Sequence, residues 1–284
     1  MVESFGVRLS RAMAERGPLC VGIDPHSSLL TAWGLPDTPA GLAAFAETVV
    51  DALADRVAVL KPQSAFFERF GSAGVAVLES TIRHSRERGA VVILDAKRGD
   101  IGTTAQAYAD AYLDPSSPMY ADALTVNPFL GFGSITPFLQ VAERFGGGVF
   151  VLALTSNPEG GEVQRAIGPT GRTVAQALLD EVALRNAGAE PVGSVGVVIG
   201  ATHGPIGHDV TDINAPVLVP GLGAQGAVAA DLATVLPGLK GLVVPSYSRE
   251  VLTQGPTIAG LREAAARSLD DCRKVLNYPV LRKG

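Results

Sequence analysis

Eight short runs of apolar and mostly β-branched residues recur along the chain, separated by longer segments with helical periodicity. Hydrophobicity is continuous rather than alternating within each run, as strands covered on both faces require. The runs occupy residues 19–24, 57–61, 90–96, 122–127, 148–155, 194–200, 215–221 and 241–246. They predict eight strands of a parallel sheet.

The segments between these runs carry apolar positions at helical spacing. They are clearest at 40–56, 73–89, 171–188 and 257–271, and an amphipathic helix is expected at about 4–16. Strand followed by helix, eight times, predicts an α/β fold, a (β/α)8 TIM barrel, in preference to an open doubly wound sheet. No segment resembles a linker, so we expect residues 1–284 to form a single domain with the N-terminal helix packed on it.

Composition narrows the possible functions. Hydrophobic residues make up 47% of the chain and charged residues 18%, which excludes a disordered protein. A net charge of −5 without a basic tract argues against nucleic acid as a partner. No apolar run reaches membrane-spanning length, so no membrane partner is expected. Two distant cysteines, Cys20 and Cys272, and an N-terminus unlike a signal peptide favour the cytoplasm.

Polar residues stand where several of the predicted strands end. Lysine is scarce, with five against eighteen arginines, yet two of the five end apolar runs. Any one such residue is explained as well by an ordinary ion pair. Because catalytic residues of these barrels lie at the carboxyl ends of strands, the set favours an active site. Its members are Asp24, Lys61, Asp95, Lys97, Asn127, Thr155 and Ser156.

The stretch "LDAKRGDIGTT", residues 94–104, is the most informative. Residues i and i+2 of a strand share a face, so Asp95 and Lys97 should both point into the barrel mouth. Asp100 falls beyond the strand, on a loop. With Lys61 nearby, these groups would form an array of alternating charges that keeps every member ionised despite burial. Such an array offers a rigid cationic proton donor beside an anion.

Two further loops suggest a phosphate site. "VPGLGAQGA" (219–227) follows the seventh run, and "VVPSYSRE" (243–250) follows the eighth and supplies Arg249. Loops after strands seven and eight commonly bind phosphate in these barrels, although a glycine-rich turn alone can be merely a tight turn. The four histidines show no paired-ligand spacing, so no metal is expected.

The pattern Asp-x-Lys-x-x-Asp-Ile-x-x-Thr resembles that of the orotidine 5′-phosphate decarboxylases, and the likeness extends over almost the whole chain. The longer chain and "SYSREVL" resemble the longer, bacterial-type branch of that family. The resemblance implies cofactor-free decarboxylation of orotidine 5′-monophosphate to UMP and CO₂ in pyrimidine biosynthesis. It also implies a homodimer in which Asp100, Ile101 and Thr104 reach into the partner's barrel.

The same resemblance assigns roles to the other candidates. Lys97 would be the proton donor, with Asp95, Asp100 and Lys61 in the charge network. Asp24 would contact the ribose, Ser156 the pyrimidine, and Gln225, beside Pro220, the phosphate together with Arg249.

Two rival functions stay open at this point. Sugar-phosphate decarboxylases and aldolases of the same superfamily share Asp-x-Lys-x-x-Asp and use Mg²⁺, with an acidic ligand implied where this chain has Lys61. A non-catalytic nucleotide-binding barrel would have no use for a buried proton donor. Which loop closes over a ligand is also open, because the loop after Gln225 is short and the segment 156–171 is long and glycine-rich.

Overall fold

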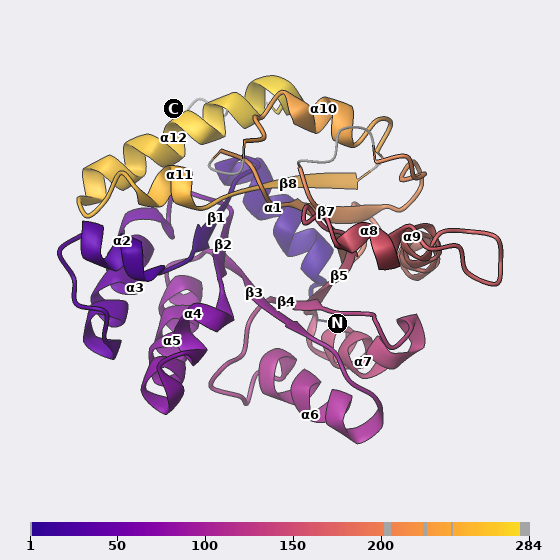
Figure 1. Ribbon diagram of the computed structural model, residues 1–284, viewed down its shortest axis with the longest axis horizontal. Coiled ribbons are helices and arrows are strands. Elements are labelled where there is room, and N and C mark those ends of the chain that lie inside the picture. The colour runs from indigo at the N-terminus through magenta and orange to yellow at the C-terminus, as the bar shows by residue number, and fades with distance from the viewer. Residues whose placement is uncertain (1, 202–205, 224–225, 240, 279–284) are drawn as a thin grey trace.

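Eight parallel strands close into a barrel in which each strand pairs with the next and β8 pairs with β1 (Figure 1). The computed structural model describes residues 2–201, 206–223, 226–239 and 241–278. Every predicted apolar run contains a strand, so the (β/α)8 prediction is confirmed. The strands are β1 (Cys20–Ile23), β2 (Val59–Pro62), β3 (Val91–Arg98), β4 (Ala123–Val126), β5 (Gly148–Leu154), β6 (Val195–Ile199), β7 (Ala215–Val219) and β8 (Gly241–Tyr247).

Helices surround the barrel and cover the outer faces of the strands (Figure 1). The long ones are α3 (Pro39–Leu53), α5 (Gly71–Glu87), α6 (Gly102–Leu113), α7 (Thr136–Phe145), α9 (Val174–Asn186) and α12 (Ile258–Leu276). Short helices lie in the connections: α2 (Ser27–Ala32), α4 (Ser64–Glu68), η1 (Phe132–Ile135), α8 (Gly160–Gln164), α10 (Asp231–Val235) and α11 (Arg249–Leu252). No helix among the described residues is both long and apolar enough to cross a membrane.

Several helix boundaries differ by a few residues from those expected from periodicity, and two of the differences have a clear cause. α9 begins at Val174 rather than 171, because the Thr173 hydroxyl caps it by accepting a hydrogen bond from the Gln176 N–H. α12 continues to Leu276 because it still buries Cys272 beyond the predicted end. It stops at Asn277, whose backbone is left-handed.

The helix α1 (Phe5–Arg16) closes the amino-terminal end of the barrel (Figure 1). Its buried face carries Phe5, Leu9 and Met13 into a cluster with the inward-facing residues of the strands. Phe5 meets Phe150 edge to face, with ring centroids 5.8 Å apart. The opposite end of the barrel is therefore the one left open for a site.

The barrel interior changes from apolar to polar along several strands. In β3 the inward position passes from Ile93 to Asp95, and in β2 it passes from Val59 to Lys61. Inward-facing side chains recur every second residue. In each of these strands the last apolar residue of the barrel core and the charged residue at the mouth are therefore only two positions apart. The same strand that stabilises the core thus positions a charged group at the rim.

Candidate active site

A cavity of about 400 Å³ lies at the carboxyl ends of the strands. Its floor is polar, and its walls include Phe66, Leu152 and Leu222. Eight of the residues predicted from the sequence line it: Asp24, Lys61, Asp95, Lys97, Thr155, Ser156, Pro220 and Arg249. Gln225 lies outside the described residues.

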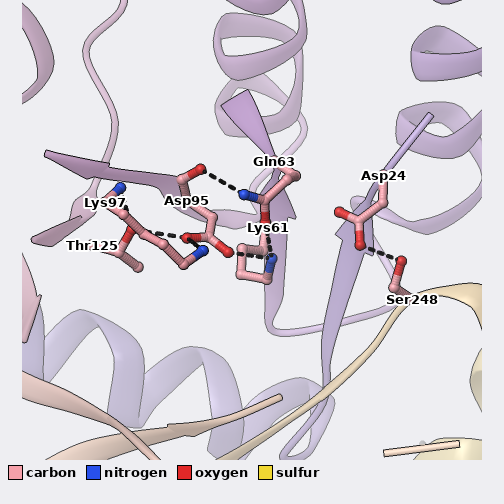
Figure 2. A network of polar contacts seen from close by, with 7 residues as sticks. All are labelled: Asp24, Lys61, Gln63, Asp95, Lys97, Thr125 and Ser248. Carbon is pink, nitrogen blue, oxygen red and sulfur yellow. Dashed lines mark hydrogen bonds and ion pairs between the residues drawn. The ribbon is translucent and has the colours of Figure 1, made fainter. Parts of the chain in front are cut away.

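Asp95 is the centre of a compact charge network (Figure 2). Its carboxylate accepts hydrogen bonds from Lys61 Nζ at 3.0 Å, from Lys97 Nζ at 2.6 Å and from Thr125 Oγ1 at 2.9 Å. Asp95 is only 7% exposed. A buried carboxylate with these three donors is well compensated for the loss of water.

The two buried charges fix each other's ionisation. Burial by itself would raise the pKa of Asp95, but the ammonium groups of Lys61 and Lys97 outweigh it and hold that pKa below its ordinary value. Burial would likewise lower the pKa of Lys61, but the carboxylates of Asp95 and Asp24 raise it above the ordinary value. Both groups therefore stay charged at neutral pH.

Lys97 reaches this network through an irregularity in β3. Leu94 pairs with Leu124 of β4, and Arg98 pairs with Val126, so three residues of β3 lie opposite one residue of β4. Lys97 has a φ of 49°, in the left-handed backbone region that residues other than glycine rarely adopt. Its side chain is 43% exposed, so the ammonium both touches Asp95 and faces the open cavity.

Gln63, the residue that follows β2, joins Lys61 to β3. Its Oε1 lies 3.4 Å from Lys61 Nζ, and its Nε2 donates to the backbone oxygen of Asp95 at 3.3 Å. Sequence reasoning did not single out Gln63 or Thr125. Both were visible as polar residues at the ends of apolar runs, in "LKPQ" and "DALTVN".

Asp24 lies at the end of β1, across the cavity from this network (Figure 2). The Ser248 hydroxyl donates a hydrogen bond to its Oδ2. Its Oδ1 is buried and has no hydrogen-bond partner among the described residues. This oxygen is therefore an acceptor available to a ligand hydroxyl. Ser248 was missed in the sequence, because β1 and β8 become neighbours only when the barrel closes.

The rim after β7 and β8 includes Pro220, Gly221 and Arg249, in the two loops where the sequence predicted a phosphate site. Arg249 is the first residue of α11 and is exposed. His26 lines the same end of the cavity and packs against Phe66 in a tilted arrangement, with ring centroids 4.1 Å apart. Burial lowers the pKa of His26, and the charge of Arg249 adds to this effect. His26 was not a sequence-based candidate.

Asp100, Ile101 and Thr104 lie outside this cavity. The Asp100 carboxylate accepts a hydrogen bond from the Ile101 N–H at 2.8 Å, and the charge array within one chain is Lys61, Asp95 and Lys97. Ile101 is 61% exposed, and Thr104 is exposed on the first turn of α6. The sequence-based array of four charges is thus not assembled by one chain alone.

A second and larger hollow of about 940 Å³ adjoins the mouth. It shares Lys97, Leu152, Thr155 and Ser156 with the first cavity and extends between the loop after β4 and the segment after β5. That segment includes α8, and Gln164 fixes it by bonding both the N–H and the hydroxyl of Thr155.

A closed parallel barrel with a charged network at its carboxyl-terminal mouth defines a TIM-barrel enzyme site. Comparison with known proteins then identifies the family. The sequence profile of the orotidine 5′-phosphate decarboxylase / HUMPS family matches residues 17–262, and this chain belongs to that family.

Individual relatives agree with this assignment. The orotidine 5′-phosphate decarboxylase of Salinispora arenicola is 64% identical over 275 residues, which cover 97% of this chain and 99% of the relative. A Streptomyces avermitilis protein of known crystal structure is 57% identical in sequence. Its structure superimposes on this one with a TM-score of 0.94, covering 98% of both chains. The OMP decarboxylase of Leishmania donovani is 29% identical, with a TM-score of 0.73 over 96% of this chain and 98% of that one.

Proposed function

We propose that this protein decarboxylates orotidine 5′-monophosphate to UMP and CO₂. The observation that carries the proposal is the Lys61–Asp95–Lys97 network at the floor of a cavity whose far rim carries Arg249. The family and the curated relatives named for this activity support it. Decarboxylation of this substrate is a step of pyrimidine biosynthesis.

The decarboxylation needs a fixed positive charge and a proton donor, and the network supplies both. When CO₂ leaves C6 of the pyrimidine, the bonding electron pair remains on a ring carbon. A fixed positive charge beside that carbon stabilises the developing carbanion, and the same group can deliver the proton. Lys97 fits both tasks, because its ammonium faces the cavity and is held by Asp95. The C6–carboxylate bond breaks, a C6–H bond forms, and Lys97 regains its proton from water.

The remaining residues bind the substrate in this proposal. The free Oδ1 of Asp24 accepts a hydrogen bond from a ribose hydroxyl. Ser156 contacts the pyrimidine, while Pro220, Gln225 and Arg249 form the phosphate end. The phosphate takes no part in bond breaking, so its binding energy serves to hold C6 against Lys97.

The magnesium-dependent alternative conflicts with the charge at the end of β2. Lys61 lies 3.0 Å from Asp95, where an acidic ligand would be needed. A cation bound there would be repelled by the ammonium and would have to displace it from its carboxylate. The proposed reaction accordingly uses no metal at this position.

A single assay separates the candidate functions. Purified protein is given orotidine 5′-monophosphate, and CO₂ release is followed with and without EDTA. We expect turnover that EDTA does not alter. No CO₂ release from orotidine 5′-monophosphate, together with turnover of a sugar phosphate that EDTA abolishes and Mg²⁺ restores, would favour the sugar-phosphate enzymes. Binding of UMP without any turnover would favour a nucleotide sensor.

We further propose that the enzyme is a homodimer with shared active sites. Asp100, Ile101 and Thr104 do not line the cavity of their own barrel, and the exposed Ile101 and Thr104 are available to a second copy. Ile101, Phe129 and Leu130 are exposed large apolar side chains at the same end of the barrel, with exposed fractions of 61%, 73% and 54%. A second copy would cover this apolar surface and bring an acidic group to the open side of Lys97.

A cytoplasmic location is proposed as well. Cys20 and Cys272 are free and buried, as is usual for proteins kept in a reducing compartment.

A further inference from the structure

Thr125 is a polar residue in an otherwise apolar strand. It lies near the end of β4 and is 1% exposed, with Leu124 and Val126 fully buried beside it. Its hydroxyl points into the barrel mouth toward Asp95 (Figure 2). A hydroxyl buried at this depth has to be hydrogen-bonded, and this one both donates and accepts a hydrogen bond.

The hydrogen-bond roles at Thr125 follow from the chemistry of its partners. An ionised carboxylate has no proton to give, so the Thr125 hydroxyl donates to Asp95 Oδ1 at 2.9 Å. The backbone N–H of Lys97 donates to Thr125 Oγ1 at 3.0 Å. One oxygen atom therefore ties the side chain of the anion to the main chain of the cation.

This bridge fills the gap left by the irregularity in β3. Extra residues in one strand lose their ladder partners, and a buried N–H without a partner is costly. The register jumps between Leu94 and Arg98, so the N–H of Lys97 has no carbonyl of β4 opposite it. The Thr125 hydroxyl replaces that carbonyl, and Lys97 stays in the left-handed conformation that turns its side chain back to Asp95.

We propose that Thr125 is a positioning residue of the reaction: its hydroxyl holds Lys97 in the strained conformation from which the ammonium meets both Asp95 and the substrate. This inference rests on the proposed function. Thr125 takes no proton and need not touch the substrate. Its role is to keep the proton donor aligned, and a small misplacement of a reacting group can cost about 100-fold in rate.

The test compares Thr125→Val, which keeps the shape and removes both hydrogen bonds, with Thr125→Ser, which keeps both bonds and removes a methyl group. We expect kcat to fall by about 10- to 100-fold in the valine variant. KM and the affinity for UMP should change by less than about threefold, because the phosphate and ribose contacts remain. The serine variant should retain kcat within about threefold.

Thr81→Val is the matched control. Thr81 is also buried and hydrogen-bonded, to the Val77 backbone oxygen, but lies in α5 away from the cavity. The Thr81→Val variant should unfold at a lower temperature than the wild type and keep the wild-type kcat per folded molecule. If Thr125→Val does not fold, Thr125→Cys, with a comparable volume and a weak donor, takes its place with the same expected loss.

Two kinetic results would overturn the inference: unchanged kcat in the valine or cysteine variant, or an equal loss in the serine variant, which would assign the effect to packing. A crystal structure of the variant gives an independent reading. Lys97 should leave the left-handed region, or its Nζ should separate from Asp95, and an unmoved Lys97 would contradict the proposal. If wild-type protein lacks decarboxylase activity, the proposed function fails while this structural result still tests the role of Thr125.

Discussion

Asp95 shows why charged residues occur at the end of a strand that is otherwise apolar. A carboxylate 7% exposed would be strongly disfavoured alone, but two ammonium groups and one hydroxyl compensate it. The arrangement is therefore stable only as a set. The same mutual dependence holds the reactive ammonium of Lys97 in place.

Replacing Lys97 by alanine should abolish most of the catalysis and little of the binding. The change removes the proposed proton donor and one of the two cations that balance Asp95. A general-acid role alone is worth about 10²–10⁴-fold, so kcat should fall by at least that amount. UMP affinity, measured by calorimetry, should change far less.

Lys274→Ala is the control, since Lys274 is exposed and pairs with Asp271 on the surface of α12. It should leave kcat unchanged. A Lys97→Ala enzyme within tenfold of wild type would show that another group delivers the proton.

The lowered pKa of Asp95 predicts how stability depends on acid. A carboxylate whose pKa is lowered in the folded state contributes stability above its ordinary pKa of about 3.9, and this contribution is lost as the pH falls toward the folded value. Asp95→Asn lacks the contribution and leaves Lys61 buried without its anion, at a cost of about 3–5 kcal/mol.

Urea unfolding of both proteins between pH 3 and 6 measures this effect. The difference in the free energy of unfolding should be constant near pH 5–6 and shrink below about pH 4. A difference that grew toward acid would contradict an ionised, stabilised Asp95.

At the scale of elements, the amino-terminal end of the barrel contributes to stability and the carboxyl-terminal end carries the site. α1 seals the amino-terminal end with Phe5, Leu9 and Met13. Arg8 pairs with Asp122 and donates to the backbone oxygen of Gly146 at 2.9 Å, which fixes the helix to the strands. The loops at the carboxyl end carry the cavity and need not contribute to this packing.

Phe5→Ala should therefore destabilise the protein without changing its chemistry. Truncating a fully buried phenylalanine costs about 3–5 kcal/mol, and Phe5 also loses its edge contact with Phe150. Chemical denaturation should report this loss, while kcat per folded molecule stays unchanged. Leu184→Ala, at an apolar residue 72% exposed on α9, is the control and should change neither. A reduced kcat at full folding would mean that α1 influences the mouth.

The loops after β7 and β8 supply the proposed phosphate end, and Arg249→Ala tests it. We expect kcat/KM for orotidine 5′-monophosphate to fall by about 10- to 100-fold, as for the loss of a charged hydrogen bond. KM should rise and kcat should fall, because binding energy from the remote phosphate is used in the transition state. Arg267→Ala on the exposed side of α12 should have no effect.

A substrate without phosphate provides the decisive comparison. Orotidine should react poorly with wild type and almost equally poorly with Arg249→Ala. An equal proportional loss on both substrates would remove Arg249 from the phosphate site.

At the scale of the whole molecule, one barrel holds only part of the proposed site. Lys97 lines the cavity, whereas Asp100 of the same chain lies outside it and accepts a hydrogen bond from the Ile101 N–H. The exposed Ile101, Phe129 and Leu130 lie near the same rim. These features are what a two-fold dimer with exchanged active-site residues requires.

Mixing two inactive variants tests the shared site. Lys97→Ala and Asp100→Ala chains are unfolded together in equal amounts and refolded, which should make roughly half of the dimers mixed. In each mixed dimer one site has both lesions and the other is intact, so roughly a quarter of wild-type activity should return. If Asp100 serves its own barrel, every site keeps a lesion and nothing returns. Mass-tagged chains confirm that subunits exchanged.

The sequence by itself determined the barrel and most of its mouth. Eight continuous apolar runs are a local signal for buried parallel strands, and a polar residue at the end of a run marks the rim of such a barrel. Asp24, Lys61, Asp95 and Arg249 could be placed there because each depends only on its own strand and the loop after it.

Only the tertiary structure decided how these groups meet. Alternation along β3 predicted that Asp95 and Lys97 share a face, and both do line the cavity, but through a strand whose register shifts and a left-handed Lys97. The Thr125 hydroxyl that holds this shape and the Ser248 hydroxyl on Asp24 come from other strands or their loops. Such contacts have no local signal, because they exist only after barrel closure brings distant segments of the chain together.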